Sequence, residues 1–283
     1  MTIKPNKIKT LALYSVIFIT IGFIAVPVII NFITNPSNNR DWNDDQKILP
    51  YATIKDNLIH IYNIRNFSYS SPKTYTPDYY DNVFDLNKIK RVWYVVEPFS
   101  GVPGSAHTFL SFEFEDNKFI SISVEIRKEK DEEYSPIKGL LNRYEVMYVI
   151  ADERDVIKLR SNYRNDLVYL YPANANKEKV KLLFLDMINR TNNLNNHPEF
   201  YNTITNNCTT NIVNHINKIG SKKISLFNLS VILPASSDKL AYHLGLIDTN
   251  LSFDDTKSLY LINDRATKHA TDPDFSVKIR TKE

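Results

Sequence analysis

The chain has 283 residues, of which 43% are hydrophobic and 12% aromatic, so it can form a sizeable core and is not disordered over most of its length. Its 35 basic and 32 acidic residues give a formal net charge of +3, which is too small and too mixed to indicate a nucleic-acid-binding surface. One cysteine excludes an internal disulfide and multi-cysteine metal sites, and no Gly-rich phosphate-binding motif occurs. We therefore expect no metal, no cofactor and no nucleic-acid partner.

An apolar segment without charged residues lies near the amino terminus, at residues 11–30. It is as long as the roughly 20-residue helix that crosses a bilayer, and no small-residue cleavage site follows it. Three lysines precede it, and the first basic residue after it is Arg40, so the positive-inside rule places the amino terminus in the cytoplasm. The predicted segments are a cytoplasmic amino terminus (residues 1–10), a transmembrane anchor (11–33), a linker (34–54) and one extracytoplasmic domain (55–283).

Hydrophobic periodicity divides the exported part into a strand-rich half and a helical half. Alternating apolar residues predict strands at 59–64, 91–96, 108–114, 119–126, 144–150, 156–159 and 168–171. Helical spacing predicts helices at 177–194, 208–219 and 236–244, the second ending at Gly220 in a left-handed conformation, before an irregular tail. Because strands and helices are segregated, we expect an α+β domain in which an antiparallel sheet packs on helices.

The cysteine, Cys208, follows Asn206 and Asn207 at the start of the predicted helix 208–219. Backbone N–H groups and the positive end of the helix dipole favour a thiolate there, which is the nucleophilic form. A free thiol outside the cytoplasm is consistent with that role. The other interpretation is a small buried hydrophobic side chain, the commonest role of a lone cysteine.

A thiol nucleophile needs a base, and the chain has six histidines. His107 begins the strand at 108–114 directly after a loop with Gly and Pro, where a strand end can meet an open edge. His215 lies two turns from Cys208 on the same helix, about 10 Å along the axis and out of hydrogen-bonding reach. His60 lies among isoleucines in mid-strand. We therefore predict that His107 is the general base.

The predicted hairpin at 108–126 suggests a third member of the site. Pairing residue 107 with residue 125 gives the hairpin one face that is almost wholly apolar. Glu125 then lies across from His107, where it can fix the tautomer and stabilise the imidazolium ion. Alternatively, Glu125 pairs with Arg127, two residues along the same face. Arg127, Asn206 and Asn207 are further candidates for supporting the site or holding an oxyanion.

Three acidic residues surround Arg154, in the run Asp152-Glu153-Arg154-Asp155. Such a run is compatible with a metal site, but the interrupting arginine favours ion pairs instead. We expect a surface turn here.

Several motifs resemble, in order, the Lnb-like N-terminal periplasmic domain family. They are Ala106–Phe112 (AHTFLSF), Ser123–Arg127 (SVEIR), the stretch 144–160, and Tyr201-Asn202-Thr203 followed by Asn206–Thr210 (NNCTT). The likeness covers roughly residues 55–220. The order of histidine before cysteine also resembles the permuted papain-like arrangement of lecithin:retinol acyltransferases.

This resemblance implies a thiol acyltransferase with a permuted papain-like fold, in which Cys208 and His107 match the catalytic pair. Members of this type N-acylate bacterial lipoproteins. The expected partners are therefore phospholipid or lipoprotein acyl chains, lipoprotein amino termini and the bacterial inner membrane. Two other functions stay open: a cysteine peptidase or cell-wall amidase that uses the same pair, and a non-catalytic binding or assembly module in which Cys208 is inert.

Overall fold

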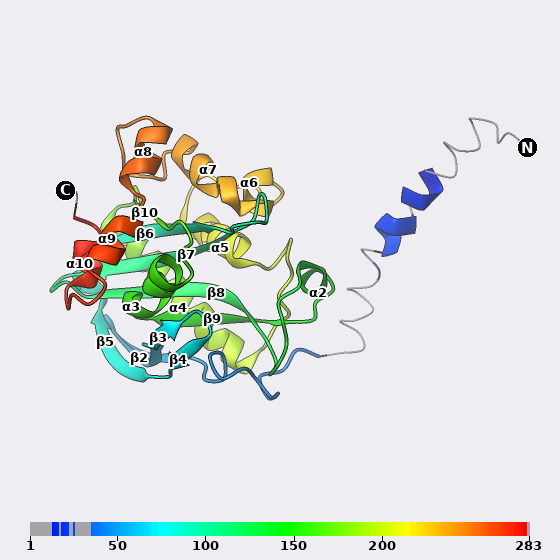
Figure 1. Cartoon of the computed structure of the whole chain (residues 1–283), viewed down its shortest axis with the longest axis horizontal. Helices are drawn as coiled ribbons and strands as arrows, with labels where there is room; N and C mark the ends of the chain where they lie inside the picture. Colours follow the sequence, from blue (N-terminus) through cyan, green and yellow to red (C-terminus); the bar gives the residue numbers. More distant parts are fainter. Residues whose placement is uncertain (1–12, 17, 23–24, 26–34, 282–283) are drawn as a thin grey trace, which may run out of the picture.

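The computed structural model of the chain describes residues 13–16, 18–22, 25 and 35–281 (Figure 1). The predicted cytoplasmic amino terminus and most of the predicted anchor at 11–33 lie outside these residues. Within the described part, no helix is both long and apolar enough to cross a membrane. This finding contradicts the prediction that the fold includes a transmembrane helix.

One sheet of eight strands forms the centre of the domain, in the order β1-β2-β9-β8-β7-β6-β10, with β5 pairing with β2 (Figure 1). Its strands are β1 (Tyr51–Lys55), β2 (Leu58–Arg65), β5 (Tyr79–Asp85), β6 (Ile89–Pro98), β7 (Ala106–Phe114), β8 (Phe119–Arg127), β9 (Glu145–Ala151) and β10 (Tyr169–Pro172). β3 (Ser68–Ser71) and β4 (Thr74–Thr76) form a separate hairpin. β2 and β9 run parallel, joined at Arg65 and Ala151. The sheet is therefore mixed, and the prediction of an antiparallel sheet is wrong on this point.

The hairpin of β7 and β8 has the predicted register, from Phe109 opposite Ser123 to Glu113 opposite Phe119. Its apolar face is buried, because alternate residues such as Phe112 and Ile122 point into the core under the helices of one sheet face. Pairing stops at Phe109, although β7 begins at Ala106 and β8 continues to Arg127. The two strands are thus unpaired with each other at this end of the sheet.

Helices cover both faces of the sheet and one end of it (Figure 1). They are α2 (Pro136–Leu140), α3 (Glu153–Lys158), the π-helical turn η2 (Leu159–Tyr163), α4 (Lys177–Asn196), α5 (Cys208–Ile219), α6 (Leu229–Ile232), α7 (Ser237–His243), α8 (Phe253–Leu259), α9 (Asn263–Lys268) and α10 (Phe275–Lys278), with 3-10 turns η1 (Leu86–Lys88) and η3 (Pro234–Ser236). α4 and α5 pack on the face that carries Phe112 and Ile122, and the residues of α3, α9 and α10 pack on the other.

The structure differs from the local predictions at several places. The stretch 156–159, predicted as a strand, belongs to α3 and η2, because Asp152 caps the helix by accepting a hydrogen bond from the Arg154 amide. The tail predicted as irregular contains the short helices α8, α9 and α10. Gly220 ends α5 in an extended conformation with φ of −81°, not a left-handed one; a Cβ at Gly220 would lie 3.1 Å from the Ile216 carbonyl oxygen.

The acidic run at 152–155 is largely buried instead of exposed. Glu153 and Asp155 are each 0% exposed, and each pairs with an arginine from a distant segment. Asp155 accepts hydrogen bonds from Arg65 Nε at 2.9 Å and Nη2 at 3.0 Å. Glu153 pairs with Arg280 close to the carboxyl terminus. The run therefore ties α3 to β2 and to the segment after α10.

Candidate functional site

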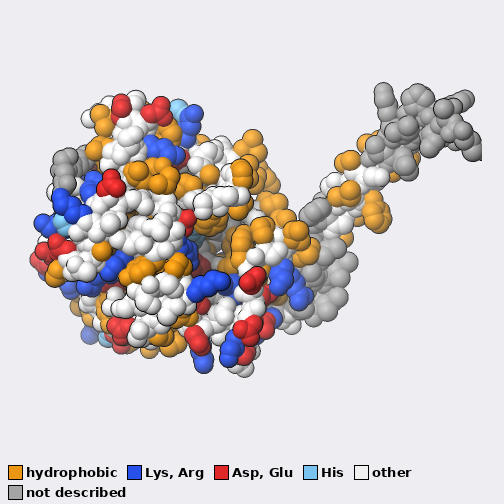
Figure 2. Space-filling model, in the orientation of Figure 1, with side chains coloured by type: hydrophobic (Ala, Val, Ile, Leu, Met, Phe, Trp, Pro, Cys, Tyr) orange, Lys and Arg blue, Asp and Glu red, His pale blue; other side chains and the backbone are white. Residues whose placement is uncertain are grey.

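A cavity of about 280 Å³ lies at the end of the sheet where β7 and β8 no longer pair. It is lined by His107 from β7, Glu125 from β8, and Cys208 and Asn207 from the start of α5. Figure 2 shows this side of the molecule hollowed between the segments around α2 and α6. The structure thus brings together the predicted nucleophile, the predicted base and the predicted carboxylate around one space.

Cys208 is the first residue of α5, and Asn207 fixes that helix start. The Asn207 side chain accepts a hydrogen bond from the Thr210 amide at 2.8 Å and donates one to the Thr203 carbonyl at 2.6 Å. The Thr210 hydroxyl accepts in turn from the Asn207 amide at 2.8 Å, which completes a capping box. Because its side-chain amide is occupied, Asn207 positions Cys208, while the backbone amides of the first turn of α5 are the groups available for an oxyanion.

The helix that carries Cys208 is joined directly to the strand that carries His107. The hydroxyls of Thr108 and Thr209 share a buried hydrogen bond of 2.9 Å. Because side chains alternate along a strand, Thr108 faces α5 while His107 faces the opposite side of the sheet. The imidazole and the thiol therefore approach the cavity from the two faces of the sheet, through the end where β7 and β8 are unpaired.

The tautomer of His107 follows from its hydrogen bonds. Its Nε2 lies 2.7 Å from Ser123 Oγ, and the Ser123 hydroxyl donates its proton to Glu125 Oε1 at 3.0 Å. Since a serine has one hydroxyl proton, the Ser123 oxygen accepts from Nε2–H, and Nδ1 carries the free lone pair. The direct distance from His107 Nε2 to Glu125 Oε1 is 3.8 Å. Glu125 therefore fixes the tautomer of His107 through Ser123, and its charge lies close enough to act on the imidazole across 3.8 Å.

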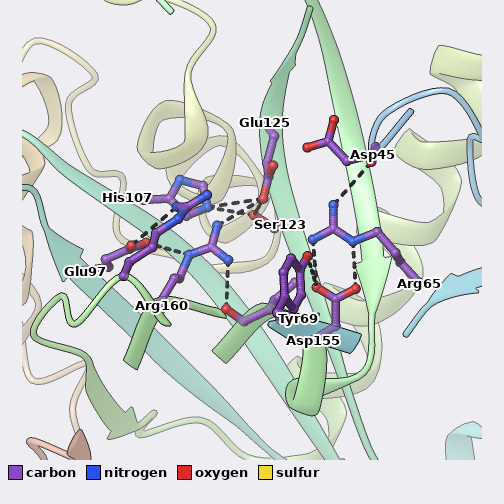
Figure 3. Close-up of polar contacts among 11 residues, drawn as sticks. Asp45, Arg65, Tyr69, Glu97, His107, Ser123, Glu125, Asp155 and Arg160 are labelled. Carbon is purple, nitrogen blue, oxygen red and sulfur yellow. Dashed lines mark hydrogen bonds and ion pairs between the residues drawn. The ribbon is translucent and has the colours of Figure 1, made fainter. Parts of the chain in front are cut away.

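An arginine bridges the two strands on either side of His107 (Figure 3). Arg160, from η2, donates to Glu125 on β8 at 3.1 Å and to Glu97 on β6 at 2.5 Å. Glu97 is paired opposite His107 in the sheet register, and its carboxylate is 0% exposed. The sequence alternative in which Glu125 pairs with Arg127 is not what the structure shows, because Arg160 takes that position.

The charges of this cluster set the protonation states of the site. Burial, with the positive charge of Arg160, lowers the pKa of His107 to about 3, against the opposing effect of Glu125. Burial favours the protonated form of Glu125, but Arg160 and His107 outweigh it and hold the pKa of that carboxyl well below its usual value. The resting site therefore has a neutral imidazole and an ionised Glu125 at neutral pH.

Two predicted supporting residues serve the surroundings of the site. The Arg127 guanidinium donates to the carbonyls of Gln46 at 2.9 Å and Lys47 at 2.8 Å, and it lies 4.3 Å from the Trp42 ring centre. It thereby holds the segment predicted as a linker against the domain. Asn206 donates to the Phe200 carbonyl at 2.8 Å and so braces the loop before α5.

Ser123, Arg160 and Glu97 also contact the site, and none of them was predicted from the sequence. Ser123 lies two residues before Glu125 on the same strand face, so period-two alternation offered a signal for it. Glu97 and Arg160 come from segments whose packing against β7 and β8 has no local pattern in the sequence.

We expect Glu97 to make stability depend on pH. Burial raises the pKa of Glu97 from 4.5 to about 7, against the lowering effect of Arg160 and Arg164. Between these values the folded state holds a proton that the unfolded state has lost, so this stabilisation is full below pH 4.5 and is lost as the pH rises through 7. Glu97→Gln cannot lose this stabilisation. The Tm of the variant minus the Tm of the natural protein should therefore increase as the pH rises from 5 to 8, as measured by thermal melts. Glu113→Gln is the control, because the pKa of Glu113 is lowered; an equal pH trend in both variants would contradict the assignment.

The family of the chain follows from a match to a protein-family model. The model of the Lnb N-terminal periplasmic domain matches residues 75–240, more than half of the 283-residue chain, and this range includes Cys208 and His107. The chain belongs to the Lnb N-terminal periplasmic domain family. The predicted family is thus confirmed, and membership supports an extracytoplasmic location and a bacterial origin for this Lnb domain. No curated protein and no solved structure matches the chain.

Proposed function

We propose that this Lnb domain is a cysteine-dependent acyltransferase that carries an acyl group on Cys208, from a phospholipid or lipoprotein acyl ester to the amino terminus of a bacterial lipoprotein. The observation that carries the proposal is the shared cavity of Cys208 and His107, in which Ser123 and Glu125 orient the imidazole. Nucleophile, base and orienting carboxylate are the groups that acyl transfer through a thioester requires.

In the first half-reaction, His107 Nδ1 takes the Cys208 thiol proton as Sγ attacks the carbonyl carbon of the donor ester. Backbone amides at the start of α5 hold the oxyanion. The carbon–oxygen bond of the ester then breaks, the alkoxide takes the proton from the imidazolium ion, and a lyso-product leaves. In the second, the amine of the acceptor attacks the thioester, loses a proton to His107, and the thiolate of Cys208 recovers that proton as it departs.

The low pKa of His107 affects how the thiol is activated. A stable thiolate–imidazolium pair needs a protonated imidazole, and burial with Arg160 disfavours that form. Proton transfer is therefore concerted with attack on the acyl carbonyl, with His107 as a general base. Glu125 stabilises the positive charge that develops on His107 only during the reaction.

The direct test is the intact mass of the protein after incubation with diacyl phosphatidylethanolamine vesicles. The expected result is a hydroxylamine-sensitive adduct of one acyl chain on Cys208, which disappears when a lipoprotein amino-terminal peptide is added and appears on that peptide. Release of free fatty acid without acylated peptide would instead support a hydrolase. No adduct and no turnover with either substrate would overturn the proposal in favour of a binding module.

We expect Ser123→Ala to lower turnover by about one to two orders of magnitude, because it disturbs the orientation of the base without removing it, and losing the base itself costs about 10²–10⁴-fold. The substitution removes the oxygen that accepts from His107 Nε2–H. Ser121→Ala is a matched control, since Ser121 lies two residues earlier on β8 and its buried hydroxyl has no hydrogen-bond partner in the described part of the chain. Ser123→Thr should recover much of the activity, because it restores the hydroxyl. Equal turnover rates for the two alanine variants would show that the hydrogen bonds from His107 through Ser123 to Glu125 play no part in catalysis.

A further inference from the structure

A second cavity, of about 170 Å³, lies on the other side of the α5 start from the catalytic cavity. Its walls are almost entirely aliphatic; they include Leu110 of β7, Val213 and Ile216 of α5, and Leu240 and Ala241 of α7. We call it the aliphatic cavity. The proposed acyl transfer at Cys208 does not use the side chains that line it.

The aliphatic cavity begins one residue away from the nucleophile. Cys208 lines the catalytic cavity and Thr209 lines the aliphatic one. The opposite wall repeats this arrangement, because Val231 of α6 lines the aliphatic cavity and Ile232 lines the catalytic cavity. The two cavities are therefore neighbours on both sides, and the boundary between them passes Thr209 and Val231.

The chemistry of the walls selects the occupant. A peptide in this cavity would bury amide groups without hydrogen-bond partners, which is costly. An alkyl chain has no such groups, and each methylene that it buries strengthens binding about fourfold. The space also follows α5 from Thr209 to Gly220, a distance of about 16 Å at 1.5 Å per residue.

We propose that the aliphatic cavity holds the acyl chain while its carbonyl group lies at Cys208. This inference rests on the proposed acyl transfer and names its substrate as a long-chain acyl group. An extended chain advances about 1.2 Å per bond, a third of the span of an extended residue. The cavity therefore accommodates an acyl chain of about 13 carbon–carbon bonds, and its own length limits the length of the chain that binds.

The experiment uses Cys208→Ala of the full chain, which binds without reacting, and saturated fatty acids of increasing length as probes that displace a fluorescent fatty acid. Affinity should rise with each methylene up to about 14 carbons and then level off. Adding Ile216→Trp fills the aliphatic cavity about two-thirds of the way from Thr209 to Gly220, so long chains should bind at least a hundredfold more weakly while short chains are little affected. Asn214→Trp is the matched control, because Asn214 is exposed on the same helix.

The outcomes separate the two proposals. Equal affinity of the long chains for the Ile216→Trp and Asn214→Trp proteins, with both folded by thermal melting, overturns the acyl-chain site. If Ile216→Trp unfolds the domain, Ala241→Leu provides the same test from the opposite wall and should shorten the preferred chain. Length-dependent binding without any thioester on natural Cys208 would support the cavity and reject acyl transfer. Thioester formation that is insensitive to chain length would reject the cavity alone.

Discussion

Replacing Cys208 by serine should abolish acyl transfer, with a loss of at least three orders of magnitude in kcat, while the melting temperature changes little. The oxygen of serine occupies nearly the same space at the start of α5 but is a far weaker nucleophile without a stronger base. His107→Ala should give a loss of similar size, because the two residues act as one unit and such losses do not add. Steady-state transfer to a lipoprotein peptide, measured for both single variants and the double variant, checks this.

A suitable control for the nucleophile is His215→Gln on the same helix. His215 is buried, bonds Tyr148 Oη at 2.7 Å and Asp186 at 2.5 Å, and lines neither cavity. This variant should lose stability rather than turnover per folded molecule. A Cys208→Ser protein with activity near that of the natural protein would remove the thioester from the mechanism.

The largest expected effect on stability comes from Asp155→Ala. Asp155 accepts hydrogen bonds from Arg65, from the Phe67 amide at 2.9 Å and from Tyr69 Oη at 3.0 Å, and it has no exposed surface. Its removal leaves the buried Arg65 guanidinium without a carboxylate, and the Asp45 carbonyl, 3.4 Å from Arg65 Nη1, carries no charge to replace it, so the free energy of unfolding should fall by about 3–5 kcal/mol.

Urea denaturation measures that loss, and Arg154→Ala provides the comparison on the same helix. Arg154 pairs with Asp152 but its side chain is 51% exposed, so the cost should be below about 1 kcal/mol. If the two variants lose equal free energy, Asp155 does not anchor α3 in the way that its contacts indicate.

The parts of the fold that follow from local pattern were predictable. The period-two alternation at 108–126 gives the hairpin and its register, because a one-residue slip would mix polar and apolar faces. The start of α5 at Cys208 follows from the asparagine cap and the apolar spacing after it. Both signals depend only on neighbours in the chain.

The parts that depend on distant segments were not predictable. The residue types of the run at 152–155 are those of an exposed turn. The run is buried because Asp155 pairs with Arg65 and Glu153 pairs with Arg280, and both arginines lie far away in the sequence. In the same way, the partner of Glu125 is Arg160 instead of the nearer Arg127. The spacing of charges along the chain does not indicate which of the two arginines lies next to Glu125 in the folded protein.

The two parts of the candidate site are held by hydrogen bonds that differ widely in sequence separation. The hydrogen bond from His107 to Ser123 spans 16 residues within one hairpin, whereas the bond from Thr108 to Thr209 spans 101 residues. Contacts between distant residues carry a larger loop-closure cost than local ones. We therefore expect the base and Ser123 to assemble as a local unit and the nucleophile to join them when α5 docks. If α5 undocks while the hairpin stays folded, the thiol becomes exposed, and alkylation of Cys208 should then occur faster than unfolding of the sheet.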